Sequence, residues 1–128
     1  MSSVSDGTVR PEALLPGAAH FNDGEYFEAH EEWEKAWYGT EGEENRFLKG
    51  LIQVAVSLYH LETGNLAGAR KVMLTAVGYL KEFPSQRSGV DLDHLRAQIL
   101  PICRELEEGR DPFAMVQASP PRVVVKVD

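Results

Sequence analysis

The sequence predicts an all-α protein, a compact bundle of about five helices built from αα-hairpins. Apolar residues recur at helical spacing in several long segments, and these segments are separated by glycine, proline or asparagine. No stretch has the alternating pattern of a credible sheet. The chain has 128 residues, of which 43% are hydrophobic and 26% are charged. These values are ordinary for one globular domain.

Composition divides the chain into a tail, a domain and a second tail. Residues 1–10 are rich in small polar residues, which predicts a flexible tail. Residues 11–110 contain the helical patterns and form the domain. Residues 111–128 end in a Pro-Pro-Arg-Val-Val-Val run, which predicts an extended C-terminal tail that lies along the domain or a neighbour.

The first elements of the domain are short. Pro11 is expected to open a short helix, because proline suits the first helical position. Pro16 is expected to start a turn that runs to Asn22. Asp23 and Gly24 then break the chain.

Residues 25–38 predict a strong amphipathic helix, because apolar residues recur along one face at helical spacing. That face carries Tyr26, Ala29, Trp33 and Trp37. We expect the aromatic residues of this region to belong to the core, namely Tyr26, Phe27, Trp33, Trp37 and Tyr59.

Residues 43–63 are the most apolar segment and predict a central, buried helix. Two more helices are expected over residues 67–83 and 92–108. Asp91 is the expected N-cap of the last helix, and Pro101 should kink or divide it.

A weak internal echo relates residues 20–29 to residues 60–69 at an offset of 40 residues. In both copies, a helix end with histidine is followed by a glycine turn and by a helix start with alanine. Each copy therefore predicts an αα-hairpin, and the two hairpins are expected to stack.

Charge and composition exclude several classes of protein. The net charge of −7 argues against a nucleic-acid binder. No apolar run approaches the roughly 20 residues of a membrane span, so we expect no membrane partner. The single cysteine, Cys103, cannot form an internal disulfide, which favours a cytoplasmic protein. The partners left open are a small-molecule substrate of unknown identity and a second copy of the chain in a homo-oligomer.

The helix over residues 25–38 carries the strongest functional signal. His30 and Glu34 are one helical turn apart, so their side chains can meet or share a ligand. On a helical wheel that starts at Tyr26, Glu34 lies at about 80°, within the apolar arc. A carboxylate among aromatic rings is costly to ionise unless a hydrogen bond, a cation or a metal receives it. We therefore expect Glu34, together with Glu31, to turn inward.

The string His-Glu-Glu-Trp-Glu resembles the His-Glu-x-x-His zinc signature, with Glu34 in place of the second histidine. In the metal hypothesis, His30, Glu34 and His60 bind a divalent ion, with zinc preferred. Glu31 or Glu34 is then the general base that acts on a bound water, and Gln53 is an orienting group.

Two alternatives stay open at this stage. The His30–Glu34 pair can instead be a buried hydrogen bond that serves packing. On the next helix, Gln53 and His60 lie in a narrow polar stripe that Gly50 extends. This stripe is either a strip of solvent exposure or one wall of a polar pocket that faces His30 and Glu34. In the second case, Gly50 would let the two helices approach closely.

Two blocks of the sequence resemble the family of the domain of unknown function 309. The first is Phe21-Asn22-x-Gly24-x-Tyr26-Phe27-Glu28-Ala29-His30-Glu31, followed by Trp33-Glu34-x-x-Trp37. The second is Phe47-Leu48-x-Gly50-Leu51-Ile52-Gln53, followed by Tyr59-His60 and Gly64-Asn65-x-x-Gly68-Ala69. Trp33 stands where the family often has leucine. The resemblance implies a compact, all-helical bacterial domain that is sometimes described as a predicted metal-dependent hydrolase, without an established substrate.

Two hypotheses about function follow. The leading one is a metal-dependent hydrolase with a site formed by His30, Glu34 and His60, alongside Glu31 and Gln53. The competing one is a non-enzymatic structural or protein-interaction domain, in which the same residues form a buried hydrogen-bond network.

Overall fold

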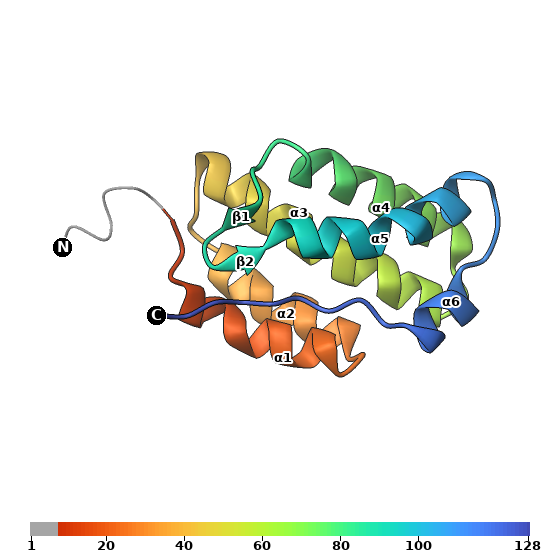
Figure 1. Cartoon of the computed structure of the whole chain (residues 1–128), viewed down its shortest axis with the longest axis horizontal. Helices are drawn as coiled ribbons and strands as arrows, with labels where there is room; N and C mark the ends of the chain where they lie inside the picture. Colours follow the sequence, from red (N-terminus) through yellow and green to blue (C-terminus); the bar gives the residue numbers. More distant parts are fainter. Residues whose placement is uncertain (1–7) are drawn as a thin grey trace.

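The computed structural model describes residues 8–128 as six α-helices, one 3₁₀ helix and one two-stranded sheet, which confirms the all-α prediction (Figure 1). Residues 1–7, most of the predicted tail over 1–10, lie outside the described residues. No helix in residues 8–128 is long and apolar enough to cross a membrane. In chain order the elements are η2 (Pro11–Leu14), α1 (Leu15–Asn22), α2 (Tyr26–Trp37), α3 (Gly42–Glu62), α4 (Leu66–Leu80), β1 (Gln86–Arg87), β2 (Val90–Asp91), α5 (Leu92–Glu107) and α6 (Phe113–Ala118).

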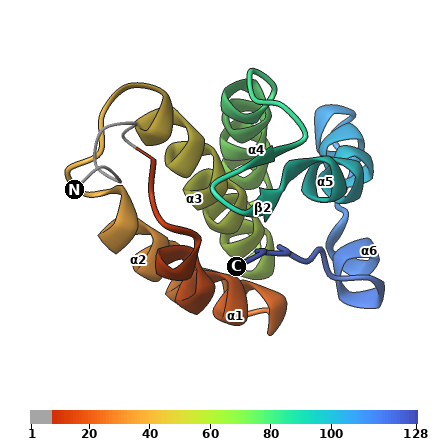
Figure 2. The same ribbon diagram turned by 60° about the vertical axis from the view of Figure 1, so that its left-hand side comes forward.

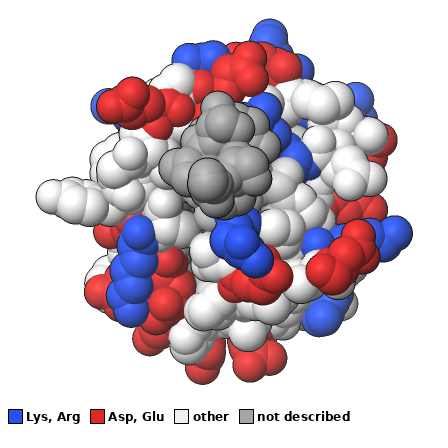
Figure 3. All heavy atoms as spheres, turned by 90° about the vertical axis from the view of Figure 1, so that its left-hand side faces the viewer, with Lys and Arg blue, Asp and Glu red and all other residues white. Residues whose placement is uncertain are grey.

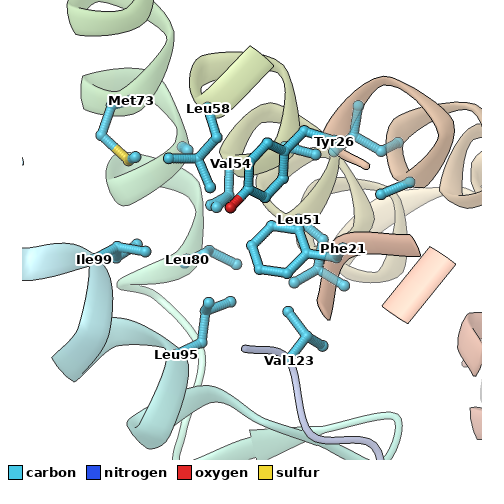
Figure 4. Packing of buried hydrophobic residues seen from close by; sticks show 14 of the residues in the cluster. Phe21, Tyr26, Leu51, Val54, Leu58, Met73, Leu80, Leu95, Ile99 and Val123 are labelled. Atoms are coloured by element: carbon cyan, nitrogen blue, oxygen red, sulfur yellow. The ribbon is translucent and has the colours of Figure 1, made fainter. Parts of the chain in front are cut away.

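Helix α3 is the centre of the bundle. It lies between α2 and α4, and α5 packs on the other side of α4 (Figure 2). Most of α3 is buried, as its apolar sequence predicts. Figure 4 shows the core in which side chains from five helices meet a valine of the C-terminal run, among them Phe21, Tyr26, Leu51, Leu58, Leu80, Leu95 and Val123.

The internal echo corresponds to two αα-hairpins, one formed by α1 and α2 and the other by α3 and α4. In the first turn, the N–H of Glu25 donates to the carbonyl of His20 at 2.9 Å. In the second turn, the N–H of Asn65 donates to the carbonyl of His60 at 2.8 Å. The glycine before each donor has a φ of 80° or 82°, a left-handed conformation that favours glycine. The same turn therefore recurs in both halves of the sequence.

Residues 15–22 correct the prediction of a turn that starts at Pro16. They form helix α1, and Pro16 lies in its first turn, where a missing N–H breaks no intrahelical hydrogen bond. The helix buries Phe21 completely. With only eight residues, α1 is too short to give a clear helical repeat in the sequence.

Helix α5 begins after the predicted N-cap, Asp91, whose carboxylate accepts a hydrogen bond from the N–H of His94 at 3.0 Å. The helix is not divided at Pro101. Proline leaves the carbonyl of Ala97 without its intrahelical donor, and both residues are exposed. Water can therefore hydrogen-bond to that carbonyl, which lets the helix continue.

The predicted extended tail over 111–128 is extended only from residue 119 onward, because residues 113–118 form α6. The extended run passes back along the domain between α1 and β2 (Figure 1). It is anchored at Val123, which is 2% exposed. The side chain of Asn22 accepts from the N–H of Val123 at 2.8 Å and donates to its carbonyl at 3.0 Å.

The structure also contains a small sheet that the sequence does not predict. Strands β1 and β2 have two residues each, too few to produce an alternating pattern. Ser88 and Gly89 join them with φ values of 50° and 84°, the left-handed values of a type I′ turn. Val90 of β2 also forms an isolated bridge with Val125, so the hairpin supports the C-terminal run.

Glu44, in the first turn of α3, is the buried acidic side chain of the described residues and is 2% exposed. Its Oε1 accepts a hydrogen bond from Nε of Arg87 at 2.9 Å and forms an ion pair with Nη2 of the same residue at 2.8 Å. Its Oε2 accepts from the N–H of Val9 at 2.9 Å and from the hydroxyl of Ser88 at 2.8 Å. These contacts satisfy both oxygens, so the carboxylate joins the N-terminal segment, α3 and the hairpin.

Substituting Glu44→Ala should lower the free energy of unfolding by about 3–5 kcal/mol, because it leaves the guanidinium of Arg87 mostly buried without its main partner. Glu43→Ala is the matched control. Glu43 contacts the same guanidinium at 3.2 Å from a side chain that is 66% exposed, so its loss should cost less than about 1 kcal/mol. Urea unfolding measures both, and equal losses would contradict the assigned role of Glu44.

Gly50 of α3 should be intolerant of a side chain, since a Cβ there would lie 2.6 Å from Cδ2 of Leu80 on α4. We expect Gly50→Ala to lower the free energy of unfolding by about 1–3 kcal/mol through overpacking. Gly78→Ala is the control, because a Cβ at this helical position meets nothing within 4 Å. It should raise stability by about 0.5–1 kcal/mol in the same urea titration. A gain in both variants would show that α3 and α4 do not approach closely at Gly50.

Candidate functional site

His30 of α2 has an imidazole that is 17% exposed. Its Nδ1 lies 2.6 Å from the carbonyl oxygen of Phe27. Because a carbonyl only accepts hydrogen bonds, Nδ1 carries a proton. Nε2 lies 3.9 Å from Oε1 of Glu34. The two side chains approach each other, as their spacing predicts, but this distance is too long for a hydrogen bond.

The expectation that Glu34 and Glu31 turn inward is wrong. The side chain of Glu34 is 54% exposed, and Glu31 is also exposed. The buried residues of α2 are only Tyr26, Ala29 and Trp33, so the buried stripe is narrower than the apolar arc of the helical wheel. A long glutamate side chain beside so narrow a stripe reaches water with its carboxylate.

The contacts of the described residues join His30 to Glu34, but they join neither Gln53 nor His60 to that pair. Helix α2 contacts α3 on the flank that carries Tyr59, whose ring centroid is 5.2 Å from that of Phe27. On a helix, Gln53 and His60 lie roughly 100–120° further around the axis than Tyr59. Gln53 and His60 therefore lie on a different flank of α3 from Tyr59.

The polar stripe of α3 borders α4 instead of α2. The hydroxyl of Ser57 donates to the carbonyl of Ala69 at 2.7 Å. Oε1 of Gln53 is buried and has no hydrogen-bond partner in the described part of the chain. The close helix approach that was expected at Gly50 does occur, but it joins α3 to α4.

His60 and His20 each contact a residue of a hairpin turn. Nδ1 of His60 lies 3.4 Å from Nδ2 of Asn65, across the turn between α3 and α4. His20 occupies the equivalent place between α1 and α2, with Nδ1 2.7 Å from Oε1 of Glu25. The hydrogen bond to Glu25 raises the pKa of His20 above its ordinary value. Across residues 8–128, no group of three or more His, Cys, Asp or Glu side chains is arranged to hold a metal ion.

Three rings of α2 and α3 form a surface that we call the aromatic face: Phe27, His30 and Tyr59. The ring centroids of Phe27 and His30 are 4.9 Å apart, and those of Phe27 and Tyr59 are 5.2 Å apart. Phe27 is 42% exposed, so the expectation that it belongs to the core is wrong, whereas Tyr59 is partly buried and packs against the core. Helical spacing shows which residues share one face of α2. It does not show that the buried part of this face stops short of Phe27.

Carboxylates without cationic partners border the aromatic face. Within the described residues, Glu28 and Glu31 of α2 and Glu62 of α3 form no ion pair, whereas Glu32 pairs with Lys35 at 3.1 Å. Burial, together with the charge of Glu28, raises the pKa of Glu62 above its ordinary value. The local negative charge is therefore not compensated within the domain.

A different charge arrangement is found at the end of the molecule that carries the chain termini. Figure 3 shows acidic and basic side chains next to one another there. Elsewhere on the surface, Arg46 and Glu82 pair at 3.2 Å, and Arg110 pairs with Glu105 at 2.7 Å. Glu28, Glu31 and Glu62 lack such a partner among residues 8–128, as do a few acids elsewhere, for example Glu41 and Glu107.

Comparison with known proteins supports the family resemblance. The model of a domain of unknown function (DUF309) matches residues 14–72, which include η2, α1, α2, α3 and the start of α4. An uncharacterized protein of Aquifex aeolicus (strain VF5) is 29% identical over 108 residues, which are 83% of this chain and 32% of that protein. The uncharacterized protein YpuF of Bacillus subtilis (strain 168) is 36% identical over 88 residues, which are 67% of this chain and 51% of YpuF.

The chain therefore spans about a third and about half of the lengths of these two relatives. The matched residues include the aromatic face and the His30–Glu34 pair. Residues 14–72 of the chain therefore match the model of the family that the two sequence blocks resemble, the domain of unknown function 309.

Proposed function

We propose that this domain is a non-enzymatic protein-interaction domain whose aromatic face binds a basic segment of a partner protein. One observation carries the proposal: the exposed ring of Phe27 lies against the partly buried ring of Tyr59, beside carboxylates that have no cationic partner among the described residues. This combination suits a segment that presents both apolar and positively charged side chains.

The energetics of the aromatic face favour such a partner. Aromatic side chains bury large areas at interfaces and often dominate the binding energy. A lysine or arginine placed over Phe27 or Tyr59 would gain a cation–π interaction. Glu28 and Glu31 would attract the same cation and steer its approach. A second copy of this chain fits less well, since two proteins of net charge −7 repel each other.

His30 supports the aromatic face in this proposal. Its Nδ1–H donates to the carbonyl of Phe27, and its ring lies against the ring of Phe27. The ring contact limits the freedom of the Phe27 side chain, which reduces the entropy that a partner must offset on binding.

The proposal also covers the rest of the protein, its source and its cellular compartment. Both relatives contain sequence beyond the matched region, as expected where a binding domain is joined to other parts of a protein. Their bacterial sources support a bacterial origin for this chain. Cys103 is a free and buried thiol, which supports a reducing cytoplasm.

A zinc-dependent hydrolase is the second candidate, and the orientation of His30 is the observation that favours it. Metal-binding histidines commonly donate their second N–H to a backbone carbonyl, as Nδ1 of His30 does. Nε2 of His30 and the carboxylate of Glu34 would be the two protein ligands. His60 lies in the last turn of α3 and contacts Asn65, and residues 8–128 contain no group of three such ligands, so the three-residue set expected from the sequence does not fit the residues as placed. We therefore propose no hydrolytic reaction at these three residues.

Substituting Phe27→Ser should weaken binding to a basic peptide at least about tenfold, because it removes an exposed ring of the aromatic face. The probe is a synthetic peptide of alternating lysine, arginine and leucine, titrated calorimetrically at low salt. Leu100→Ser is the matched control, since Leu100 is an exposed apolar residue of α5 with 46% exposure. It should leave the affinity unchanged. Equal affinity for an acidic peptide of the same length, or no effect of Phe27→Ser, would contradict the proposal.

His30→Ala and Glu34→Gln separate the two candidates. If His30 only supports packing, His30→Ala should lower the free energy of unfolding by about 1–3 kcal/mol. The exposed Glu34→Gln should then change it by less than about 0.5 kcal/mol. Zinc content, measured by elemental analysis after equilibration with zinc, should be equal in the two variants and the parent chain. One zinc per chain in the parent protein, lost in both variants, would favour the hydrolase.

A further inference from the structure

A cavity of about 530 Å³ opens at the end of the bundle where the turn between α1 and α2, the end of α3 and helix α6 meet (Figure 1). Its volume lies within the range of small-molecule sites. Apolar side chains line part of the wall, including Leu58, Leu61 and Val116. The residues that can recognise a polar group there include Tyr26, Glu62 and Asp23.

Tyr26 is the unusual member of this wall. The residue is only 4% exposed, and its hydroxyl has no hydrogen-bond partner in the described part of the chain. Its side chain packs in the core with the hydroxyl directed away from α2 (Figure 4). Burial, with a contribution from the charge of Glu62, raises the pKa of Tyr26 to about 12. The phenol is therefore neutral at physiological pH and offers its oxygen as an acceptor.

The charge of the cavity is negative and uncompensated. Glu62 and Asp23 line it, and no lysine, arginine or histidine does. Among the described residues, neither carboxylate forms an ion pair. Asn22 also lines the cavity, but its amide is already bonded to Val123. The other polar side chain of the lining, Gln117, is a neutral amide, so the lining contains no cationic donor.

We propose that this cavity binds a primary alkylammonium group, with its N–H donors directed to the carboxylate of Glu62 and the hydroxyl oxygen of Tyr26. The alkyl chain then packs against Leu58, Leu61 and Val116. A phosphate or a carboxylate would not suit a site that offers negative charge and no cation. The ammonium can come from a free amine or from the lysine side chain of a partner, since both present the same chemistry.

The cavity shares Glu62 with the acidic border of the aromatic face, but the two surfaces use different aromatic residues, although Tyr26 and Phe27 are adjacent in sequence. Tyr26 is buried and lines the cavity, whereas Phe27 is exposed and contacts Tyr59. Phe27→Ser should therefore leave amine binding unchanged, and Tyr26→Phe should leave the contact between Phe27 and Tyr59 intact. The two variants therefore distinguish a failure of amine binding in the cavity from a failure of peptide binding at the aromatic face.

The experiment is an NMR titration of the full chain with n-butylammonium chloride, followed at the methyl groups of Leu58, Leu61 and Val116. We expect saturable shifts of these methyl signals and no comparable shifts with butan-1-ol, which has the same chain length and no charge. Glu62→Gln should weaken binding at least about tenfold, because it removes a charged hydrogen-bond acceptor. Tyr26→Phe should weaken it about threefold to tenfold, because it removes a neutral one.

Glu41→Gln is the control for the change in net charge. Glu41 precedes the opposite end of α3, a helix of 21 residues, so it lies about 30 Å from the cavity. It should leave the affinity within twofold of the parent chain. A second titration uses an N-acetylated, amidated lysine in place of butylammonium. Binding of either compound supports the site. The compound that binds shows whether the site accepts a free amine or a lysine side chain. Equal shifts with butan-1-ol, or equal weakening by Glu41→Gln and Glu62→Gln in folded variants, would overturn the proposal.

Discussion

The carboxylate of Glu44 joins three parts of the chain that are distant in sequence. It receives three hydrogen bonds and forms an ion pair with Arg87, and these contacts connect the N-terminal segment at Val9, the start of α3 and the hairpin at Arg87 and Ser88. The hairpin in turn pairs with Val125, so the C-terminal run depends on the same network. A buried charge is tolerated only when its partners are complete, and here they are.

The two ends of α3 therefore differ in how their polar groups are satisfied. At the end that begins with Gly42, the carboxylate of Glu44 is buried and fully partnered. At the other end, Glu62 and the hydroxyl of Tyr26 line a cavity and have no partner within the described chain. The polar group at the first end of α3 is used to stabilise the fold. The polar groups at the second end and beside the aromatic face have no such partner and can bind a ligand. This asymmetry is the physical basis for assigning recognition to the α2–α3 region.

Much of the fold follows from the sequence, but most of the site does not. Apolar periodicity predicts α2 to α5, and the echo around His20 and His60 predicts both hairpins. Short elements such as α1 and β1 carry too few residues for a pattern to emerge. The wheel places Glu34 near the apolar arc but cannot show how wide the buried stripe is. The partner of Glu44 is 43 residues away in sequence, and no local pattern indicates such a contact. The cavity likewise combines residues from separate helices.

The central claim is that the α2–α3 region recognises a basic segment, and site-specific photocrosslinking tests it most directly. A photoreactive phenylalanine analogue would replace Phe27 in one variant and the equally exposed Leu100 in another, in cells that express the protein. The crosslinked peptides are then identified by mass spectrometry. The account predicts that position 27 captures a lysine- or arginine-rich segment of another protein and that position 100 does not. Equal capture at both positions, or capture of acidic segments at position 27, would contradict it.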